Sequence, residues 1–230
     1  MTGSAIVTGG TGGLGAAVVA RLLADGWRVI VPWIVEAELE RVDRRDGLEL
    51  VRADLSDAAA VASIVSTAAS KPGAPLRGVV NLVGGYAAAG RVAETPFDDF
   101  FAQFELNLRP TYLVTAAALP SLVAAGGGSV VCVGTRAAVQ PFSGAAGYIS
   151  SKAAVIAFAQ AVAVEYKQDG VRCNAILPSV IDTPGNRASM PNADFSKWVQ
   201  PAEIAGVIAF LLSDASTPTS GAAIPVYGRA

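Results

Sequence analysis

The sequence predicts an α/β fold: a doubly wound, Rossmann-type parallel sheet of about seven strands with helices on both faces. Short apolar, β-branched runs alternate with longer segments that have the apolar spacing of helices. This alternation requires a parallel sheet with right-handed crossovers. The strand segments are apolar throughout rather than alternately polar, which is typical of strands covered by helices on both faces. Since no linker or repeat divides the chain, we expect a single domain over residues 1–230.

Apolar spacing and capping residues place each expected element along the chain. The expected strands cover residues 5–7, 28–31, 48–52, 78–83, 129–133, 171–177 and 222–226. The expected helices cover residues 13–25, 36–45, 57–70, 96–124, 147–169 and 201–213. The irregular segment 179–200, rich in Pro, Asn and Ser, directly follows the sixth strand. Because ligands bind beyond the carboxyl ends of such strands, this segment is predicted to be a substrate lid.

Composition excludes several classes of function. The chain has no histidine, which removes Ser/His/Asp hydrolysis and His-ligated zinc, and we expect no metal site. The net charge is −2 and no cluster of Lys and Arg occurs, so the sequence does not predict a basic surface that would bind nucleic acid or an anionic membrane. The longest apolar run, 153–159, is far shorter than the ~20 residues of a membrane span. We therefore expect a small-molecule substrate and, because Cys132 and Cys173 read as core thiols, a cytoplasmic location.

A glycine-rich turn follows the first strand and opens a helix. Glycine allows the tight turn, lets the backbone approach a pyrophosphate, and leaves helix N-terminal N–H groups available to bind it. Alone, such a loop is also compatible with ordinary turn chemistry, and its position in an α/β pattern favours the nucleotide interpretation. The predicted cofactor-binding residues of this turn are Gly9, Thr11, Gly13, Leu14 and Gly15.

Tyr148 and Lys152 lie one helical turn apart, on the same face of the expected fifth helix. A free tyrosine titrates near ~10, so it is a poor base until a nearby cation favours the phenolate. Lys152 is placed to supply that cation. The helix begins just beyond the fifth strand, where a cofactor should lie, so this pair is a candidate for proton transfer rather than ordinary helix surface.

The Thr-Gly-x-x-x-Gly-x-Gly turn and the Tyr-x-x-x-Lys pair resemble the short-chain dehydrogenase/reductase family, and the resemblance covers nearly the whole chain. It implies hydride transfer between NAD(H) or NADP(H) and a carbonyl or alcohol substrate. Tyr148 would carry the proton and Lys152 would also hold the nicotinamide ribose. Thr135, thirteen residues before Tyr148, stands where the family usually has a serine that binds the substrate carbonyl; a local backbone role and a second hydroxyl, Ser143, are alternatives. Asn107 matches a family asparagine linked to the lysine through water.

The resemblance also implies contacts around the cofactor. Asp54 and Leu55 would contact adenine, although Asp54 also suits a turn cap. The remaining residues implied by the resemblance are Asn81, Gly84, Pro178, Ser179, Ile181 and Thr183. At the end of the second strand, an acid binds the ribose hydroxyls of NAD or an arginine binds the 2′-phosphate of NADP. The chain has Trp33 at this position. Since no cation is visible in the glycine turn either, the balance favours NAD(H).

Pro110 falls inside the expected helix 96–124, where a proline removes a hydrogen bond and clashes with the preceding turn. We expect a kink there that frees a backbone acceptor near Asn107. Farther along, the lid resembles that of the quinonoid dihydropteridine reductases, which implies Tyr86, Arg187 and Trp198 as substrate contacts; simple packing of these aromatics is the alternative.

Three other functions stay open at this point. The lid resemblance implies NADH-dependent reduction of a quinonoid pterin or quinone. A nucleotide-binding redox sensor without chemistry is a second alternative, and an extended-family epimerase is disfavoured because it needs a larger C-terminal domain. The expected fifth helix is apolar almost all round over 153–159, so we also expect it to pack against another subunit in a dimer or tetramer.

Overall fold

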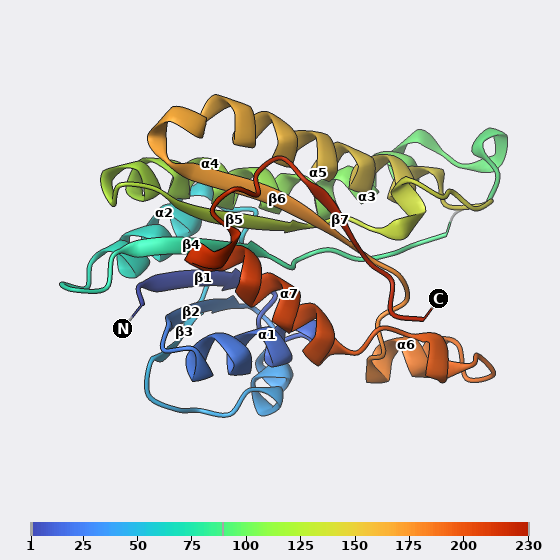
Figure 1. Ribbon diagram of the computed structural model, residues 1–230. Coiled ribbons are helices and arrows are strands. Elements are labelled where there is room, and N and C mark those ends of the chain that lie inside the picture. The colour runs from blue at the N-terminus through green and yellow to red at the C-terminus, as the bar shows by residue number, and fades with distance from the viewer. Residues whose placement is uncertain (1, 89, 230) are drawn as a thin grey trace.

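The computed structural model describes residues 2–88 and 90–229 and contains one parallel sheet in the order β3-β2-β1-β4-β5-β6-β7 (Figure 1). Every neighbouring pair is parallel. The strands are β1 (Ser4–Thr8), β2 (Arg28–Trp33), β3 (Leu48–Arg52), β4 (Leu76–Asn81), β5 (Gly128–Val133), β6 (Val171–Pro178) and β7 (Ala223–Val226). The strand order reverses between β1 and β4, which is the topological switch point where such sheets bind ligands. The predicted fold class is confirmed.

Helices cover both faces of the sheet. The bounds are α1 (Gly13–Ala24), α2 (Ala58–Ala69), α3 (Phe97–Asn107), α4 (Arg109–Ala124), α5 (Ala146–Glu165), α6 (Pro184–Ser189) and α7 (Pro201–Leu212). Helices α1 and α7 pack together on one face, and α2, α4 and α5 cover the other, with α3 against α5 (Figure 1). The lid and α6 lie past the carboxyl end of β6, at the right of the figure.

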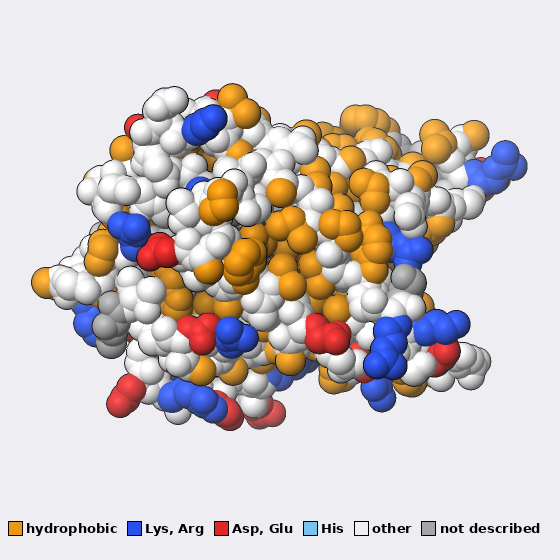
Figure 2. Space-filling view, viewed as in Figure 1, with side chains coloured by type: hydrophobic (Ala, Val, Ile, Leu, Met, Phe, Trp, Pro, Cys, Tyr) orange, Lys and Arg blue, Asp and Glu red, His pale blue; other side chains and the backbone are white. Residues whose placement is uncertain are grey.

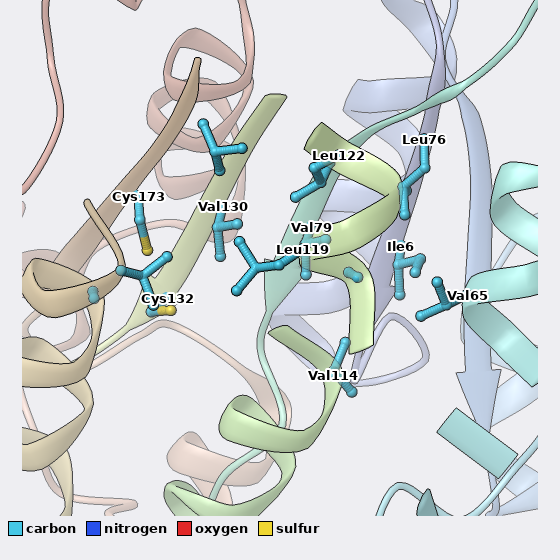
Figure 3. Packing of buried hydrophobic residues seen from close by; sticks show 14 of the residues in the cluster. Ile6, Val65, Leu76, Val79, Val114, Leu119, Leu122, Val130, Cys132 and Cys173 are labelled. Atoms are coloured by element: carbon cyan, nitrogen blue, oxygen red, sulfur yellow. The ribbon is translucent and has the colours of Figure 1, made fainter. Parts of the chain in front are cut away.

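The strands alternate their side chains between two hydrophobic layers. Along β1, Ile6 packs with α2 and α4 residues, while Ala5 and Val7 pack with α1 and α7 residues. Figure 3 shows the first layer, where Leu119 of α4 lies between the strand residues Val79 and Val130. Because both layers are fully buried, the carboxyl edge of the sheet is a rigid base for a site.

Two of the expected helices differ from the observed ones. The segment 36–45 forms only a 3-10 helix, Glu36–Arg41, which buries no side chain and so has no packing to extend it. The expected helix 96–124 is divided into α3 and α4 at Leu108, and Pro110 lies in the first turn of α4. A proline is tolerated there because the first-turn N–H groups have no partner within the helix. The predicted kink is therefore a break between two helices.

Helix α5 is long and apolar enough, by length and composition, to cross a membrane, which the short uninterrupted apolar runs did not suggest. The core helix of a globular domain passes the same test. Here α5 packs on β5 and β6 and buries Val155, Ala159 and Val162 in the first hydrophobic layer.

Candidate active site

The glycine-rich turn between β1 and α1 is as tight as its sequence predicts. Gly9 has φ +64°, and a Cβ on Gly15 would overlap the Gly9 carbonyl oxygen. Gly12 caps α1 in an extended conformation with no side-chain hydrogen bond. The first-turn N–H groups of α1 are thus capped by no side chain, which suits a pyrophosphate.

The residues predicted to take part in proton transfer meet at the start of α5. Lys152 is 6% exposed, and its ammonium donates to the carbonyl of Val133, at the end of β5, over 2.9 Å. The Asn107 side chain lies beside it at the end of α3 and is fully buried. Its Nδ2 donates to the Ser151 hydroxyl over 3.1 Å, and its Oδ1 accepts from the Gly85 N–H over 2.9 Å. The structure therefore brings α3, α5 and the end of β4 to one point.

Gly84 makes this convergence possible. A Cβ on Gly84 would lie 2.6 Å from Asn107 Oδ1 and 2.8 Å from Lys152 Nζ. Both polar atoms therefore face the bare backbone of Gly84. A carboxamide and an ammonium turned toward a surface without a side chain form a cradle for a hydroxylated group such as the nicotinamide ribose. The residues present fit a nicotinamide dinucleotide.

Burial sets the pKa values of the proton carriers. Desolvation raises the pKa of Tyr148 above its usual value, an interaction with the Thr135 side chain lowers it in part, and the nearby Tyr86 raises it. Desolvation also lowers the pKa of Lys152 to about 8, although Cys132 opposes this. The sequence analysis expected Lys152 to lower the pKa of the phenol, whereas burial is the dominant influence here and raises it. The phenol is protonated at neutral pH and is ready to act as an acid.

Thr135 and two aromatic rings lie around the phenol. Thr135 follows β5 and is buried, with its Oγ1 accepting from the Ala137 N–H over 3.3 Å while it also interacts with Tyr148. The Tyr86 ring meets the Tyr148 ring edge-on at 5.1 Å between centroids, and Phe142 packs against Tyr86 at 6.2 Å. Tyr86 is 57% exposed. It therefore forms an exposed aromatic wall beside Tyr148.

A pocket of about 240 Å³ opens on the other side of the glycine turn. The predicted cofactor residues that line it are Gly9, Thr11, Trp33, Asp54 and Leu55. Glu38 lines it as well, and the Thr11 hydroxyl donates to Glu38 Oε2 over 2.7 Å. The sequence analysis gave Glu38 no role in this region. The missing signal was the 3-10 geometry of 36–41, which changes the direction of each side chain relative to an α-helix.

Two predicted cofactor residues have structural hydrogen bonds of their own. Asp54 Oδ1 accepts from the Ser56 N–H over 2.8 Å, so Asp54 caps a turn while it lines the pocket. Asn81 is buried at the end of β4, where its Nδ2 donates to the Thr115 hydroxyl over 2.9 Å. Asn81 therefore ties β4 to α4.

The lid is folded around one carboxylate. Arg187 pairs with both oxygens of Asp182, at 2.5 and 2.7 Å, and Gln200 Nε2 donates to Asp182 Oδ2 over 2.8 Å. These bonds lower the pKa of Asp182 to about 2. The Arg187 guanidinium stacks over Phe195, which meets Trp198 edge-on. In this arrangement Arg187 is neutralised within the lid, and Trp198 is buried beneath it.

The first residues of the lid reach back to the glycine turn. A Cβ on Gly13 would lie 3.0 Å from the Thr183 methyl group, so Thr183 packs directly over that turn. Its hydroxyl also caps α6 by accepting from the Asn186 N–H over 3.2 Å. Ile181 bridges to Val199 across the lid, and the Ser179 hydroxyl donates to the Tyr227 carbonyl over 2.7 Å. Pro178 ends β6 as a buried residue.

No group of three or more Cys, Asp or Glu side chains that could hold a metal ion occurs within residues 2–88 and 90–229.

Comparison with known proteins identifies the family. The sequence profile described as short chain dehydrogenase matches residues 4–194. The chain belongs to the short-chain dehydrogenase/reductase family. It is accordingly an NAD(P)-dependent oxidoreductase of alcohol and carbonyl groups.

Relatives match over nearly the full length. The chain is 31% identical to 2-(R)-hydroxypropyl-CoM dehydrogenase of Xanthobacter autotrophicus, covering 99% of this chain and 98% of the relative. It is 31% identical to a 4-formylbenzenesulfonate dehydrogenase of Comamonas testosteroni, covering 97% and 96%. A solved short-chain dehydrogenase/reductase of Mycobacterium ulcerans superimposes with a TM-score of 0.90 at 27% identity, covering 99% and 89%. These similarities support the dehydrogenase interpretation and add nothing for a pterin reductase or a sensor without chemistry.

Proposed function

We propose that this protein reduces a carbonyl, or oxidises the corresponding alcohol, with Tyr148 as the proton carrier and NAD(H) as the coenzyme. The observation that carries the proposal is the convergence of Tyr148, Lys152, Asn107 and Thr135 at the carboxyl edge of the sheet beside bare Gly84. A bound nicotinamide would accept or deliver the hydride.

Each residue has a distinct part in the proton transfer. The buried, protonated Tyr148 phenol donates its proton to the oxygen of a carbonyl substrate as negative charge grows there. Thr135 lies beside the phenol and offers a second hydroxyl to the same oxygen. Lys152 and Asn107 face Gly84, where they hold ribose hydroxyls and fix the position of the ring.

The lid is proposed to cover the substrate once it is bound. Thr183 packs over the glycine turn and would contact the carboxamide of the coenzyme. Tyr86 supplies the aromatic wall on the opposite side of Tyr148. Arg187 and Trp198 hold the lid together, and a direct contact of either with substrate requires the lid to shift. The relatives act on chemically different substrates, so the substrate class proposed is no narrower than an alcohol or carbonyl.

We further propose a homo-oligomer in a reducing compartment such as the cytoplasm. Large apolar side chains are exposed around α3, α4 and α5, among them Phe101, Tyr112 and Val164. In Figure 2, hydrophobic side chains also gather across the middle of the face formed by β7 and α7. A second copy of the chain would cover such surfaces, and both cysteines are free thiols as a reducing compartment allows. A light-scattering mass of a single chain at micromolar concentration would refute the oligomer.

The test of the proton carrier is Tyr148→Phe. The variant should lose about 10²-fold or more in kcat, because it lacks the hydroxyl that donates the proton to the substrate oxygen. The assay is NADH consumption over a panel of ketones, aldehydes and quinones, with coenzyme affinity measured separately. Phe210→Tyr on the outer face of α7, 48% exposed, is a matched control that should leave turnover unchanged. Normal turnover by Tyr148→Phe on the best substrate would exclude the mechanism.

A further inference from the structure

We propose that Glu38, together with Thr11, reads the adenosine ribose and decides between NAD(H) and NADP(H). This inference rests on the proposed function, because it assigns a coenzyme preference to the same site. Strand β2 ends in Trp33 rather than in an acid, so an acid must come from elsewhere if the ribose hydroxyls are to be read. Glu38 supplies one, five residues farther along, from a 3-10 helix.

The position of Glu38 is fixed from two sides. Its Oε2 accepts from the buried Thr11 hydroxyl over 2.7 Å, which ties the 3-10 helix to the glycine turn. Its Oε1 accepts from Arg41 Nη1 over 3.1 Å on the outer side. The carboxylate is about one-third exposed and lies in the wall of the pocket that Trp33 and Leu55 also line. It is thus held in place before any coenzyme binds.

Hydrogen-bonding chemistry gives this wall its selectivity. An ionised carboxylate can only accept hydrogen bonds, and its two oxygens offer about four sites. Oε2 can therefore keep the bond from Thr11 and still accept one from a ribose hydroxyl. A 2′-phosphate is also an acceptor and carries negative charge, so it would face Glu38 with no hydrogen between them.

The charges around the pocket act in the same direction. Its lining includes three carboxylates, Glu38, Asp54 and Glu105, and one cation, Arg109. Arg109 Nη1 pairs with Glu105 at 2.6 Å, so that cation is already neutralised. Arg41 is the cation paired with Glu38, and it lies outside the pocket lining. With the Glu105–Arg109 and Glu38–Arg41 pairs each balanced in charge, Asp54 leaves the pocket wall net negative, and the described lining offers no unpaired cation to a 2′-phosphate.

The experiment measures the affinities of NADH and NADPH by isothermal titration calorimetry for the wild type and for Glu38→Gln. The wild type should bind NADH more tightly. Glu38→Gln should weaken NADH about 10-fold or more, since a hydrogen bond to a charged acceptor is lost, and should leave NADPH unchanged or tighter. Glu36→Gln removes the same charge from an exposed position in the same 3-10 helix and should change neither affinity.

Two further arms separate the possible causes. Higher salt should narrow the gap between NADH and NADPH in the wild type, because part of the rejection is electrostatic. Arg41→Gln should leave the preference for NADH in place. If Arg41→Gln instead removed the preference for NADH, Arg41 rather than Glu38 would be the selecting residue. Glu38→Asp provides a second variant that keeps the charge but withdraws it from the ribose, and it should lose part of the NADH affinity.

The outcomes distinguish this inference from the proposed function. NADPH binding as tight as NADH in the wild type, or equal losses for both coenzymes in Glu38→Gln, would overturn the role of Glu38 while coenzyme-dependent turnover through Tyr148 survived. A wild type that binds neither coenzyme would overturn both proposals. A melting temperature of Glu38→Gln close to that of Glu36→Gln shows that the affinity change comes from the pocket.

Discussion

The proposed catalytic cluster, which consists of Tyr148, Lys152, Asn107 and Thr135, is held by different kinds of contact from those that hold the lid. At the catalytic cluster, Lys152 donates to the Val133 carbonyl, and Asn107 accepts from the Gly85 N–H, so both buried side chains are fixed by backbone groups. In the lid, the exposed Arg187 guanidinium closes on Asp182 through side-chain contacts alone. A bond between a buried side chain and the backbone is maintained when the surface moves, whereas the Arg187–Asp182 pair can open from its exposed Arg187 side.

This difference separates two tasks. Groups that move a proton must be held within fractions of an ångström, and the catalytic cluster is built into the sheet edge that way. A lid must open for substrate, so its contacts have to be reversible. The predictions below test whether the cluster depends on fixed geometry and the lid on reversible closure.

The largest effect is expected from Thr135→Ala. Losing the hydroxyl beside Tyr148 removes a donor to the substrate oxygen and should lower kcat/KM for ketone reduction about 10²-fold, comparable to the loss of other oxyanion donors. Thr135→Ser, which restores the residue usual in the family, is the matched control and should keep most of the activity. Steady-state kinetics on one ketone measure both. Equal activity in Thr135→Ala and the wild type would mean that Thr135 only caps the turn through Ala137.

A smaller loss, about 10-fold or more in kcat/KM, is expected from Gly84→Ala. The added methyl group would lie 2.6 Å from Asn107 Oδ1 and 2.8 Å from Lys152 Nζ, so at least one of these groups must move. Coenzyme affinity should fall together with turnover. Gly206→Ala in α7 is the control, because its Cβ would meet only Arg21 Nη1 at 3.8 Å; it should be neutral or slightly stabilising. An unchanged coenzyme affinity in Gly84→Ala would show that no ligand uses this cradle.

The fold could be predicted from the sequence because its signals are local and repeated. The alternation of apolar strands with helical segments predicted the parallel sheet, whereas the division at Leu108 was expected only as a kink at Pro110 within one helix. The Tyr148 and Lys152 pair could be placed for the same reason, since helical spacing is fixed. Contacts that depend on side-chain direction in irregular segments could not be predicted. Glu38 was missed because a 3-10 turn replaced the expected helix, and the partner of Arg187 was not visible before the lid was folded.

Asp182→Asn should weaken the lid and affect binding more than chemistry. Without the carboxylate, Arg187 and Gln200 lose their shared acceptor, so KM should rise a few-fold while kcat changes little. Trypsin should also cut the variant faster after Arg187 or Lys197. Asp194→Asn, which removes an exposed turn-capping carboxylate and its ion pair with Lys197 but leaves Asp182 in place, serves as the control for cleavage after Arg187. Identical trypsin rates for Asp182→Asn and the wild type would show that this carboxylate does not hold the lid closed.

The pH dependence of the lid has a definite sign. The pKa of Asp182 is lowered to about 2, below its ordinary value of 3.8. Because the carboxyl pKa is lowered, the contribution of the Asp182 contacts to the stability of the lid is complete above about pH 4. It is lost as pH falls toward 2. The resistance of the lid to trypsin should therefore be the same between pH 5 and 8. Digestion with pepsin, which is active in acid, should show faster cleavage of the lid only at lower pH.

The smallest expected effect is a shift of the activity profile along the pH axis, and it concerns the side chains around Tyr148. Alcohol oxidation needs the phenolate, so kcat/KM for oxidation should rise with pH toward the raised pKa of Tyr148. Because Tyr86 raises that pKa, Tyr86→Phe should move the rise to lower pH while it keeps the edge-on ring contact at Tyr148. Thr135→Val should move the rise to higher pH, since the Thr135 hydroxyl lowers the same pKa. Opposite shifts from these two variants would show that the phenol is tuned by its fixed neighbours. Shifts in the same direction would show that the rise of kcat/KM with pH reflects the titration of another group. Lys152, whose pKa is about 8, is the one to test next.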